Sequence, residues 1–335
     1  MKILVTGATG FLGRRVVAAL APRHELRLLV RPAASRERFP EGVEFVSGDV
    51  TERASLAAGA AGCDAILHAA ALVKIDAPAV AFDRVNVGGL ENVLAAAAET
   101  GVGRIVYISS FIALGPTELA PGGVLDERGA LPTIAGRTWI NDYQRTKTVS
   151  DLRARQAIAG GVPLSVIYPG VIYGPGELTE GNILVRHLLD LARGRLPALV
   201  GRAERRWNYV FVDDVAAGVV AALERAPAGR RYLLGGENVT QAELYRLIAE
   251  IGGIRVPRLR MPDFLASASG FAMKGLARLT GGVPMLTPDL VEIYRHDWAY
   301  DSSTAEGDLG YRPRSLRTGL AETVAWLKET GAWPA

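Results

Sequence analysis

The stretch KILVTGATGFLG, residues 2–13, places an apolar run directly before three glycines in the spacing Gly-x-x-Gly-x-x-Gly. Lys2 to Thr6 has the pattern of a buried strand, and helical spacing of apolar residues follows from Gly13 to Leu20. Small residues in such a turn let the backbone approach a pyrophosphate, whose charge the helix N-terminus favours. A turn that serves only close helix–sheet packing is the alternative. We predict a dinucleotide-binding loop at Gly7, Thr9, Gly10, Phe11, Leu12 and Gly13.

The alternation of strand and helix patterns continues through the first half of the chain. Strand-like runs occur at residues 25–30, 43–47, 65–68, 104–109 and 164–168. Helical spacing recurs from Val80 to Thr100. Repeated strand–helix–strand units predict a parallel sheet with helices on both faces, because parallel neighbours need a crossover. The expected fold class is α/β, a Rossmann doubly wound parallel sheet with a smaller C-terminal substrate-binding lobe.

The pattern changes near Pro169, where proline and glycine become frequent and strand patterns return only at residues 208–212 and 232–235. We predict an NAD(P)-binding Rossmann domain from residues 1–169 and 207–236, and a substrate-binding lobe from residues 170–206 and 237–335. Residues 263–281 are predicted to form a helix that covers this lobe, with a membrane-surface contact as the alternative.

Composition excludes several classes of partner. The 38 basic and 35 acidic residues are interspersed and give a net charge of only +3, so no nucleic-acid partner is expected. One cysteine, Cys63, and four scattered histidines show no metal-ligand spacing. No apolar run approaches the ~20 residues of a spanning helix. We therefore expect a cytoplasmic protein with a small-molecule substrate, no metal and no membrane span.

The ends of the next strands supply further candidate cofactor contacts. Arg31 ends the second strand pattern, where an acidic residue would bind the adenine ribose diol; its guanidinium suits a 2′-phosphate and favours NADP over NAD, unless it faces solvent. Asp49, followed by Val50, could accept a hydrogen bond from the adenine amino group. Small residues end the fourth strand pattern, at Ala69, Ala70 and Ala71. Asn86 either supports this network or is a buried helix asparagine satisfied by backbone.

The proton-transfer site is predicted at Tyr143 and Lys147, which lie one helical turn apart on one face. A free tyrosine has a pKa near ~10, and a nearby ammonium lowers that pKa toward a useful range. Ser110, with Ser109 as the alternative, ends the fifth strand pattern, where open α/β sheets hold their ligands. Two serines that merely cap a strand end are the competing interpretation.

In this order the motifs resemble the extended branch of the short-chain dehydrogenase/reductase superfamily. The resemblance extends through Pro169-Gly170-Val171-Ile172-Tyr173-Gly174-Pro175-Gly176 and Val212-Asp213-Asp214-Val215. It implies that Tyr143 is the acid/base, that Lys147 also holds the nicotinamide ribose and that Ser110 polarises the substrate. It also implies a homodimer and cofactor contacts at Tyr168, Pro169, Gly170 and Val171.

Finer features, such as residues 68–73 and 109–115, resemble farnesol dehydrogenase-like and dihydroflavonol reductase-like members, and also a hopanoid-associated epimerase-like group. This resemblance implies hydride transfer between a nicotinamide and an apolar alcohol or carbonyl compound. Farnesol dehydrogenase is associated with NAD, so NADP and NAD both stay open. Phe111, Tyr173 and Asn182 are the candidate substrate contacts.

Two other functions remain open. A nucleotide-sugar epimerase or dehydratase with tightly bound NAD would use the same tyrosine and lysine, with Asn182, Arg186, Arg202, Arg205 and Arg206 as candidates to bind a diphosphate. Phe111-Ile112 argues against dehydration, because sugar dehydratases place an acidic pair there. A non-catalytic dinucleotide sensor is the third hypothesis, and such proteins commonly lose the acid/base that this chain keeps.

Overall fold

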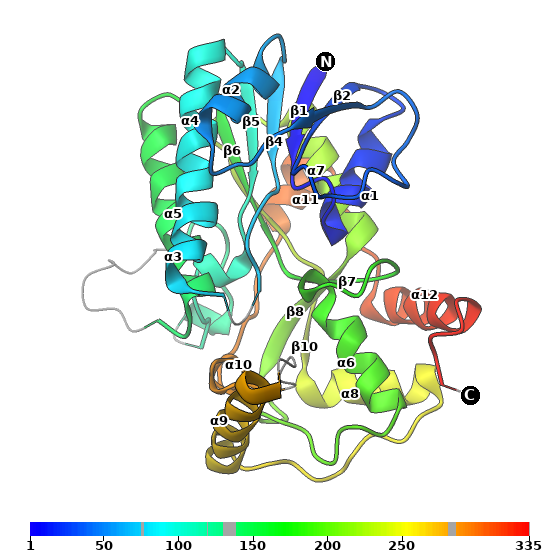
Figure 1. Ribbon diagram of the computed structural model, residues 1–335. Coiled ribbons are helices and arrows are strands. Elements are labelled where there is room, and N and C mark those ends of the chain that lie inside the picture. Colours follow the sequence, from blue (N-terminus) through cyan, green and yellow to red (C-terminus); the bar gives the residue numbers. More distant parts are fainter. Residues whose placement is uncertain (75–76, 119, 130–138, 281–285, 335) are drawn as a thin grey trace.

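The computed structural model describes residues 1–74, 77–118, 120–129, 139–280 and 286–334, and its larger half is a seven-stranded parallel sheet (Figure 1). The strand order is β3-β2-β1-β4-β5-β6-β9. The strands are β1 (Lys2–Thr6), β2 (Glu25–Val30), β3 (Glu44–Ser47), β4 (Ala65–His68), β5 (Arg104–Ile108), β6 (Leu164–Pro169) and β9 (Arg231–Leu234). All six strand patterns of the first half lie in this sheet, which confirms the predicted doubly wound fold.

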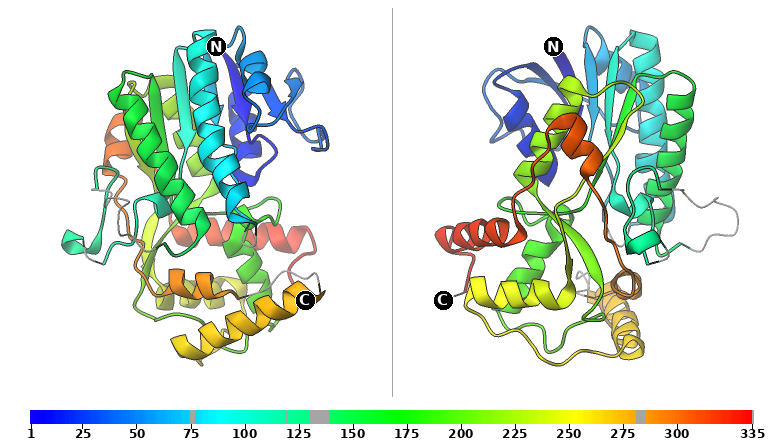
Figure 2. Two further views of the ribbon diagram at one scale, coloured as in Figure 1. Left: turned by 60° about the vertical axis from the view of Figure 1, so that its left-hand side comes forward. Right: turned by 180° about the vertical axis from the view of Figure 1, so that it is seen from behind.

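Helices cover both faces of the sheet (Figures 1 and 2). One face carries α1 (Phe11–Leu20), α7 (Val212–Arg225) and α11 (Ser303–Leu309), and the other carries α2 (Arg53–Ala60), α4 (Gly88–Thr100) and α5 (Asp142–Ala159). Successive side chains of a strand point to opposite faces. Ile3 and Val5 therefore pack in the core under α1 and α7, whereas Leu4 packs in the core under α2 and α4.

The helix predicted from Val80 to Thr100 contains a break in its regular hydrogen bonding. It consists of α3 (Ala79–Phe82), a π-helical segment at Asp83–Val87, and α4. The helix ends at Gly101, whose φ of 71° is left-handed. Single π-helical turns occur frequently at functional sites. This one faces α5, which carries Tyr143 and Lys147.

The smaller half is built around a three-stranded sheet in the order β10-β8-β7, formed by β7 (Val171–Tyr173), β8 (Arg206–Phe211) and β10 (Glu237–Thr240). Its helices are α6 (Ile183–Ala192), α8 (Gln241–Gly252), α9 (Asp263–Thr280), α10 (Pro288–Tyr294) and α12 (Leu316–Glu329). The predicted helix at residues 263–281 is α9, and Gly281 lies outside the described residues.

Two elements pack in a different half of the molecule from the one that the predicted domain division gives them. The strand pattern at residues 208–212 forms β8, which pairs with β7 and β10 and not with the parallel sheet, so this part of residues 207–236 belongs to the smaller sheet. Helix α11 lies within residues 237–335 yet packs against α7 and β9. The chain returns to the large sheet through α7, because the apolar stripe of that helix packs on α1.

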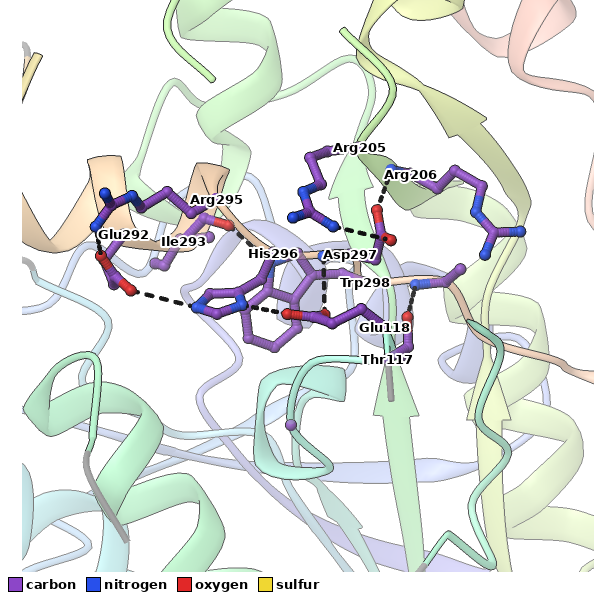
Figure 3. Close-up of polar contacts among 12 residues, drawn as sticks. Thr117, Glu118, Arg205, Arg206, Glu292, Ile293, Arg295, His296, Asp297 and Trp298 are labelled. Atoms are coloured by element: carbon purple, nitrogen blue, oxygen red, sulfur yellow. Dashed lines mark hydrogen bonds and ion pairs between the residues drawn. The ribbon is translucent and has the colours of Figure 1, made fainter. Parts of the chain in front are cut away.

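A network of charged and polar groups, which we call the polar seam, joins the loop after β5 to the smaller half (Figure 3). Asp297 accepts a hydrogen bond from the Arg206 backbone N–H at 2.8 Å and pairs with the Arg205 guanidinium at 3.3 Å. Glu118 accepts from the Asp297 backbone N–H at 3.2 Å and shares a 2.5 Å hydrogen bond with His296. The seam therefore fixes the segment after α10 against both β8 and the loop that follows β5.

Within the described residues, none of the helices is both long and apolar enough to cross a membrane. Across the same part of the chain, histidine, cysteine, aspartate and glutamate side chains form no group of three or more that could hold a metal ion.

Candidate active site

A cavity of about 1190 Å³ lies where the carboxyl ends of the parallel strands meet the smaller half of the molecule. Open α/β sheets bind their ligands at this edge. Most of the predicted site residues line it: Gly7, Thr9, Gly10, Phe11, Leu12, Gly13, Arg31, Asp49, Val50, Ala69, Ala70, Ala71, Ser110, Phe111, Tyr143, Lys147, Pro169, Gly170 and Val171. Segments separated by more than a hundred positions therefore converge on one cavity.

The glycine loop is packed so tightly that side chains would not fit. Gly7 has a φ of +74°, and a Cβ there would lie 2.5 Å from the carbonyl carbon of Ala69. A Cβ on Gly13 would lie 2.1 Å from the Gly7 oxygen. Gly10 is the N-cap of α1 and provides no side-chain hydrogen bond to it, so the first N–H groups of the helix point toward the cavity end of the loop. This arrangement fits the pyrophosphate of a dinucleotide.

The adenine side of the cavity carries the two polar candidates at the ends of β2 and β3. Arg31 is exposed and lines the cavity. Asp49 also lines it, and its Oδ1 accepts a hydrogen bond from the Thr51 backbone N–H at 2.9 Å. A cationic and an anionic group are thus available at this end of the cavity.

The three predicted catalytic side chains meet on one wall. Asn141 caps α5 by accepting a 2.8 Å hydrogen bond from the Gln144 N–H, which places Tyr143 and Lys147 in the first turns of the helix. The Lys147 ammonium is buried and donates to the Ile108 carbonyl at 3.1 Å. Tyr143 and Ser110 both line the cavity, and Ser110 lies near enough to the Tyr143 phenol to influence its pKa. Phenol, hydroxyl and ammonium therefore surround the end of β5.

Burial dominates the protonation of this wall. Burial lowers the pKa of Lys147 to about 7, because the Ile108 carbonyl replaces only part of the water that solvates an ammonium. Burial also raises the pKa of Tyr143, and the nearby Ser110 opposes that rise. The sequence predicted that the ammonium would lower the tyrosine pKa. The direction is opposite because removal of the buried phenol from water is the largest effect on its pKa.

The π-helical segment supports α5 from behind. Arg145 forms two hydrogen bonds of 2.8 Å with the Asp83 carboxylate. Asn86 donates to the Thr146 hydroxyl at 3.0 Å, and its oxygen accepts from the Leu72 N–H at 2.8 Å. Asn86 was a candidate cofactor contact, but its buried side chain is behind the cavity wall. It positions Leu72, which lines the cavity, and the helix that carries Tyr143.

Three other candidates are not among the described residues that line the cavity. The hydroxyl of Tyr168, in β6, donates to the buried carboxylate of Asp151, in α5. Tyr173 packs edge-on against Phe211 with ring centroids 5.7 Å apart, inside the core of the smaller half. The Asn182 amide donates to the Gly174 carbonyl at 3.0 Å. The two tyrosine hydroxyls and the Asn182 amide nitrogen thus donate within the protein and support the fold around the cavity, whereas Asn182 Oδ1 has no hydrogen-bond partner among the described residues.

The basic residues considered for a diphosphate are mostly engaged elsewhere. Arg205 pairs with Asp297, and Arg206 donates to the Gly123 carbonyl at 3.0 Å. Arg202 lies 3.9 Å from the Asp263 carboxylate. Of the four arginines, Arg186 lines the cavity.

The wall opposite the glycine loop contains residues that sequence reasoning missed. Lys274 and Ala277 come from α9, and Leu290 and Ile293 from α10. The sequence predicts α9 as a covering helix, with a membrane-surface contact as the alternative, and no motif within it marks a binding site. Its apolar spacing was visible, but which face meets the cavity depends on contacts with α10.

Residues 3–235 match the profile of the NAD dependent epimerase/dehydratase family. The chain belongs to this family. Family members of known or assigned activity are similar to it over nearly their whole length. "Sterol demethylase protein B" of Methylococcus capsulatus is 32% identical over 99% of both chains, and a "putative dihydroflavonol 4-reductase" of Synechocystis is 29% identical over 98% of this chain and 94% of its own. "2-alkyl-3-oxoalkanoate reductase" of Stenotrophomonas maltophilia is 30% identical over 97% and 99%.

Solved structures agree with the family assignment. The "crystal structure of gox2253" is 31% identical, with a TM-score of 0.80 and 99% coverage of both chains. A dTDP-glucose 4,6-dehydratase from Streptomyces venezuelae, solved with NAD bound, is 26% identical, with a TM-score of 0.75 over 99% of this chain and 98% of its own. The family member described here is an NAD(P)-dependent oxidoreductase of the extended short-chain type, and the predicted enzyme class and family are confirmed.

Proposed function

We propose that this enzyme interconverts an apolar alcohol and its ketone or aldehyde. The observation that carries the proposal is the pairing of two walls: Ser110, Tyr143 and Lys147 on one side, and apolar residues such as Leu290 and Ile293 on the other. Polar groups that fix orientation within a largely apolar pocket are typical of sites for apolar small molecules.

A nicotinamide, when bound, supplies the hydride chemistry. In the direction of reduction, the Tyr143 phenol donates its proton to the carbonyl oxygen of the substrate, and in oxidation the phenolate accepts that proton from the alcohol. The Ser110 hydroxyl, which lines the cavity with Tyr143, would donate to the same oxygen and stabilise the charge that develops on it. Lys147, held by the Ile108 carbonyl, would bind the hydroxyls of the nicotinamide ribose.

The nature of the substrate is proposed from the lining of the cavity. Phe111 and Ile112 follow Ser110, and α9 and α10 add further apolar side chains. The relatives named for sterol, dihydroflavonol and alkyl-oxoalkanoate substrates support an apolar compound. A nucleotide sugar would need partners for its diphosphate, and Arg202, Arg205 and Arg206 are engaged by Asp263, Asp297 and Gly123.

The finer cofactor and assembly assignments belong to the same proposal. NADP is favoured over NAD because the exposed Arg31 guanidinium lies on the cavity wall where a 2′-phosphate would be placed. A homodimer stays a prediction from the family resemblance, and a cytoplasmic location stays a prediction from the composition.

The test compares Tyr143→Phe with Tyr232→Phe, a matched change in β9 whose hydroxyl bonds Asp308 at 3.2 Å. Prenyl alcohols, steroids, flavanonols and nucleotide sugars are offered with each cofactor, and nicotinamide absorbance is followed. Loss of the acid/base should lower turnover by about 10²- to 10⁴-fold, with cofactor affinity nearly unchanged, while Tyr232→Phe keeps its activity. Full activity in Tyr143→Phe would contradict the mechanism, and epimerised sugar without net absorbance change would favour the epimerase.

A further inference from the structure

Helix α9 carries a wide apolar face that the rest of the described chain leaves uncovered. At helical spacing, Phe264, Phe271 and Leu279 are 72%, 67% and 86% exposed. Leu265 and Leu276 flank them at 46% and 61%. Single exposed apolar residues are normal on a soluble protein, but a contiguous face of this kind marks an interaction site.

The opposite side of α9 attaches the helix to the body of the protein. Ala266 is fully buried, and a Cβ on Gly270 would lie 2.9 Å from the backbone at Pro288 at the start of α10. Lys274 and Ala277, on this inner side, line the active-site cavity. The helix is therefore held with its apolar face toward the exterior of the molecule. Its opposite side faces the active-site cavity.

Positive charge accompanies the apolar face. The segment between α8 and α9 bears Arg255 and Arg258, both exposed, and Leu259, which follows Arg258, is 73% exposed. These arginines line a second hollow of about 670 Å³ together with Arg246 and Arg260, and none of its described lining residues is acidic. In the described parts of the chain, no carboxylate lies within ion-pair distance of Arg246, Arg255 or Arg258.

Both features lie at one end of the molecule. Figures 1 and 2 show α9 and the segment that leads into it at the end opposite the N-terminus. An apolar helix face beside unpaired guanidinium groups complements a bilayer, because the aromatic and aliphatic side chains enter the acyl region while the arginines meet lipid phosphates. A second protein copy would have to supply acidic groups to match the same arginines.

We propose that α9 and residues 255–260 dock this enzyme on the surface of an anionic lipid bilayer, from which an apolar substrate passes along α9 into the cavity. The docking itself needs no assumption about the reaction, whereas the passage of substrate rests on the proposed function. The bilayer is entered only to the depth of one helix face, since no described helix spans a membrane.

Vesicle co-sedimentation of the full chain tests the docking. Wild type should bind vesicles of phosphatidylcholine mixed with phosphatidylglycerol more tightly than vesicles of phosphatidylcholine alone, and added salt should weaken the difference. Phe271→Glu should lower the binding by at least about tenfold, which corresponds to about 1.4 kcal/mol. Arg255→Gln with Arg258→Gln should remove only the preference for the anionic lipid.

Val80→Glu is the matched control, because Val80 is a 70% exposed apolar residue on α3 at a distance from this surface in the sequence and the fold. It should bind vesicles as wild type does. Unchanged thermal unfolding of Phe271→Glu verifies that it is folded. Absence of vesicle binding by wild type, or equal binding by Phe271→Glu, would overturn the proposal. So would light scattering that shows a wild-type dimer and a Phe271→Glu monomer, since a second copy would then be the occupant.

Turnover separates the docking from the reaction. A long-chain prenyl alcohol supplied in vesicles should be oxidised at least several-fold more slowly by Phe271→Glu, whereas a short water-soluble alcohol should be turned over equally by both proteins. Vesicle binding without turnover of any alcohol would refute the proposed function and leave the docking intact. Equal turnover of the vesicle-borne alcohol would refute the passage of substrate along α9.

Discussion

The two walls of the cavity are assembled in different ways. The wall formed by the large sheet uses residues within a few positions of a strand end, such as Gly7 to Gly13 after β1 and Ser110 after β5. The wall formed by α9 and α10 depends on the polar seam, whose Glu118 and His296 are 178 positions apart in the chain. Local geometry determines the first wall, and long-range polar contacts determine the second. Perturbing each wall should therefore change a different measurable quantity.

The largest effect is expected in the glycine loop. In Gly13→Ala the new Cβ would lie 2.1 Å from the Gly7 oxygen, so the loop must shift. Overpacking of this kind costs about 1–3 kcal/mol, and cofactor affinity should fall by roughly tenfold to a hundredfold. Titration with reduced cofactor by fluorescence measures the change. Gly103→Ala, where no atom lies within 4 Å of the new Cβ, is the control and should bind normally. Equal affinities would mean that this loop does not hold the pyrophosphate.

A change in the polar seam should leave the cofactor wall intact. Asp297→Asn keeps the size of the side chain but removes its negative charge. That carboxylate lies 3.3 Å from the Arg205 guanidinium. Because the Arg205 charge is partly buried, unfolding free energy should fall by about 1–3 kcal/mol. The KM for substrate should rise while cofactor affinity stays constant. Urea unfolding and steady-state kinetics measure these quantities.

Glu99→Gln provides the reference for that experiment, because the Arg53–Glu99 pair is 58% and 52% exposed. Removal of such an exposed pair should cost at most about 0.5 kcal/mol. If Asp297→Asn weakened the cofactor and spared the substrate KM, the division between the two walls would be wrong.

Lys147 extends the comparison of the two walls. It belongs to the wall formed by the large sheet, yet its burial lowers the unfolding free energy. Burial lowers its pKa from 10.5 to about 7, so the unfolded chain binds more protons than the folded protein between these two values. The unfolding free energy of wild type should therefore rise with pH in this window relative to Lys147→Met, by up to about 1.4 kcal/mol per pH unit. Below pH 7 the difference becomes constant. Lys328→Met, at an exposed position in α12, should run parallel to wild type. Parallel curves for Lys147→Met would show that its ammonium is not buried in solution.

The smallest effect is expected at the edge of the first wall. Arg31 is exposed, so its pairing with a 2′-phosphate is screened by solvent. Arg31→Ala should weaken NADP by about three- to tenfold and leave NAD unchanged, as measured by titration with each cofactor. Arg53→Ala, another exposed arginine, should alter neither affinity. Unchanged selectivity in Arg31→Ala would remove the reason to favour NADP.

Residues predicted from short motifs line the same cavity where chemistry and local geometry coincide. The glycine loop, the alanines after β4 and the Tyr143–Lys147 pair each follow from spacing within one strand–helix unit. The parallel sheet required no further information, because its central strands are largely apolar and need crossover helices. Asn86 was less predictable, since only the π-helical turn shows that its amide holds Leu72 and Thr146 and does not reach the cavity.

The amino-acid sequence alone thus determined the family, the large sheet and the residues that line the sheet side of the cavity. Tertiary structure decided that β8 pairs in the smaller sheet, that Arg205 and Arg206 serve the polar seam, and that α9 turns one side to the cavity and its apolar side outward. The physical reason is the distance along the chain over which each effect acts. Strand periodicity and turn geometry depend on a few neighbouring residues, whereas the partner of a charged or apolar face comes from a segment distant in the chain.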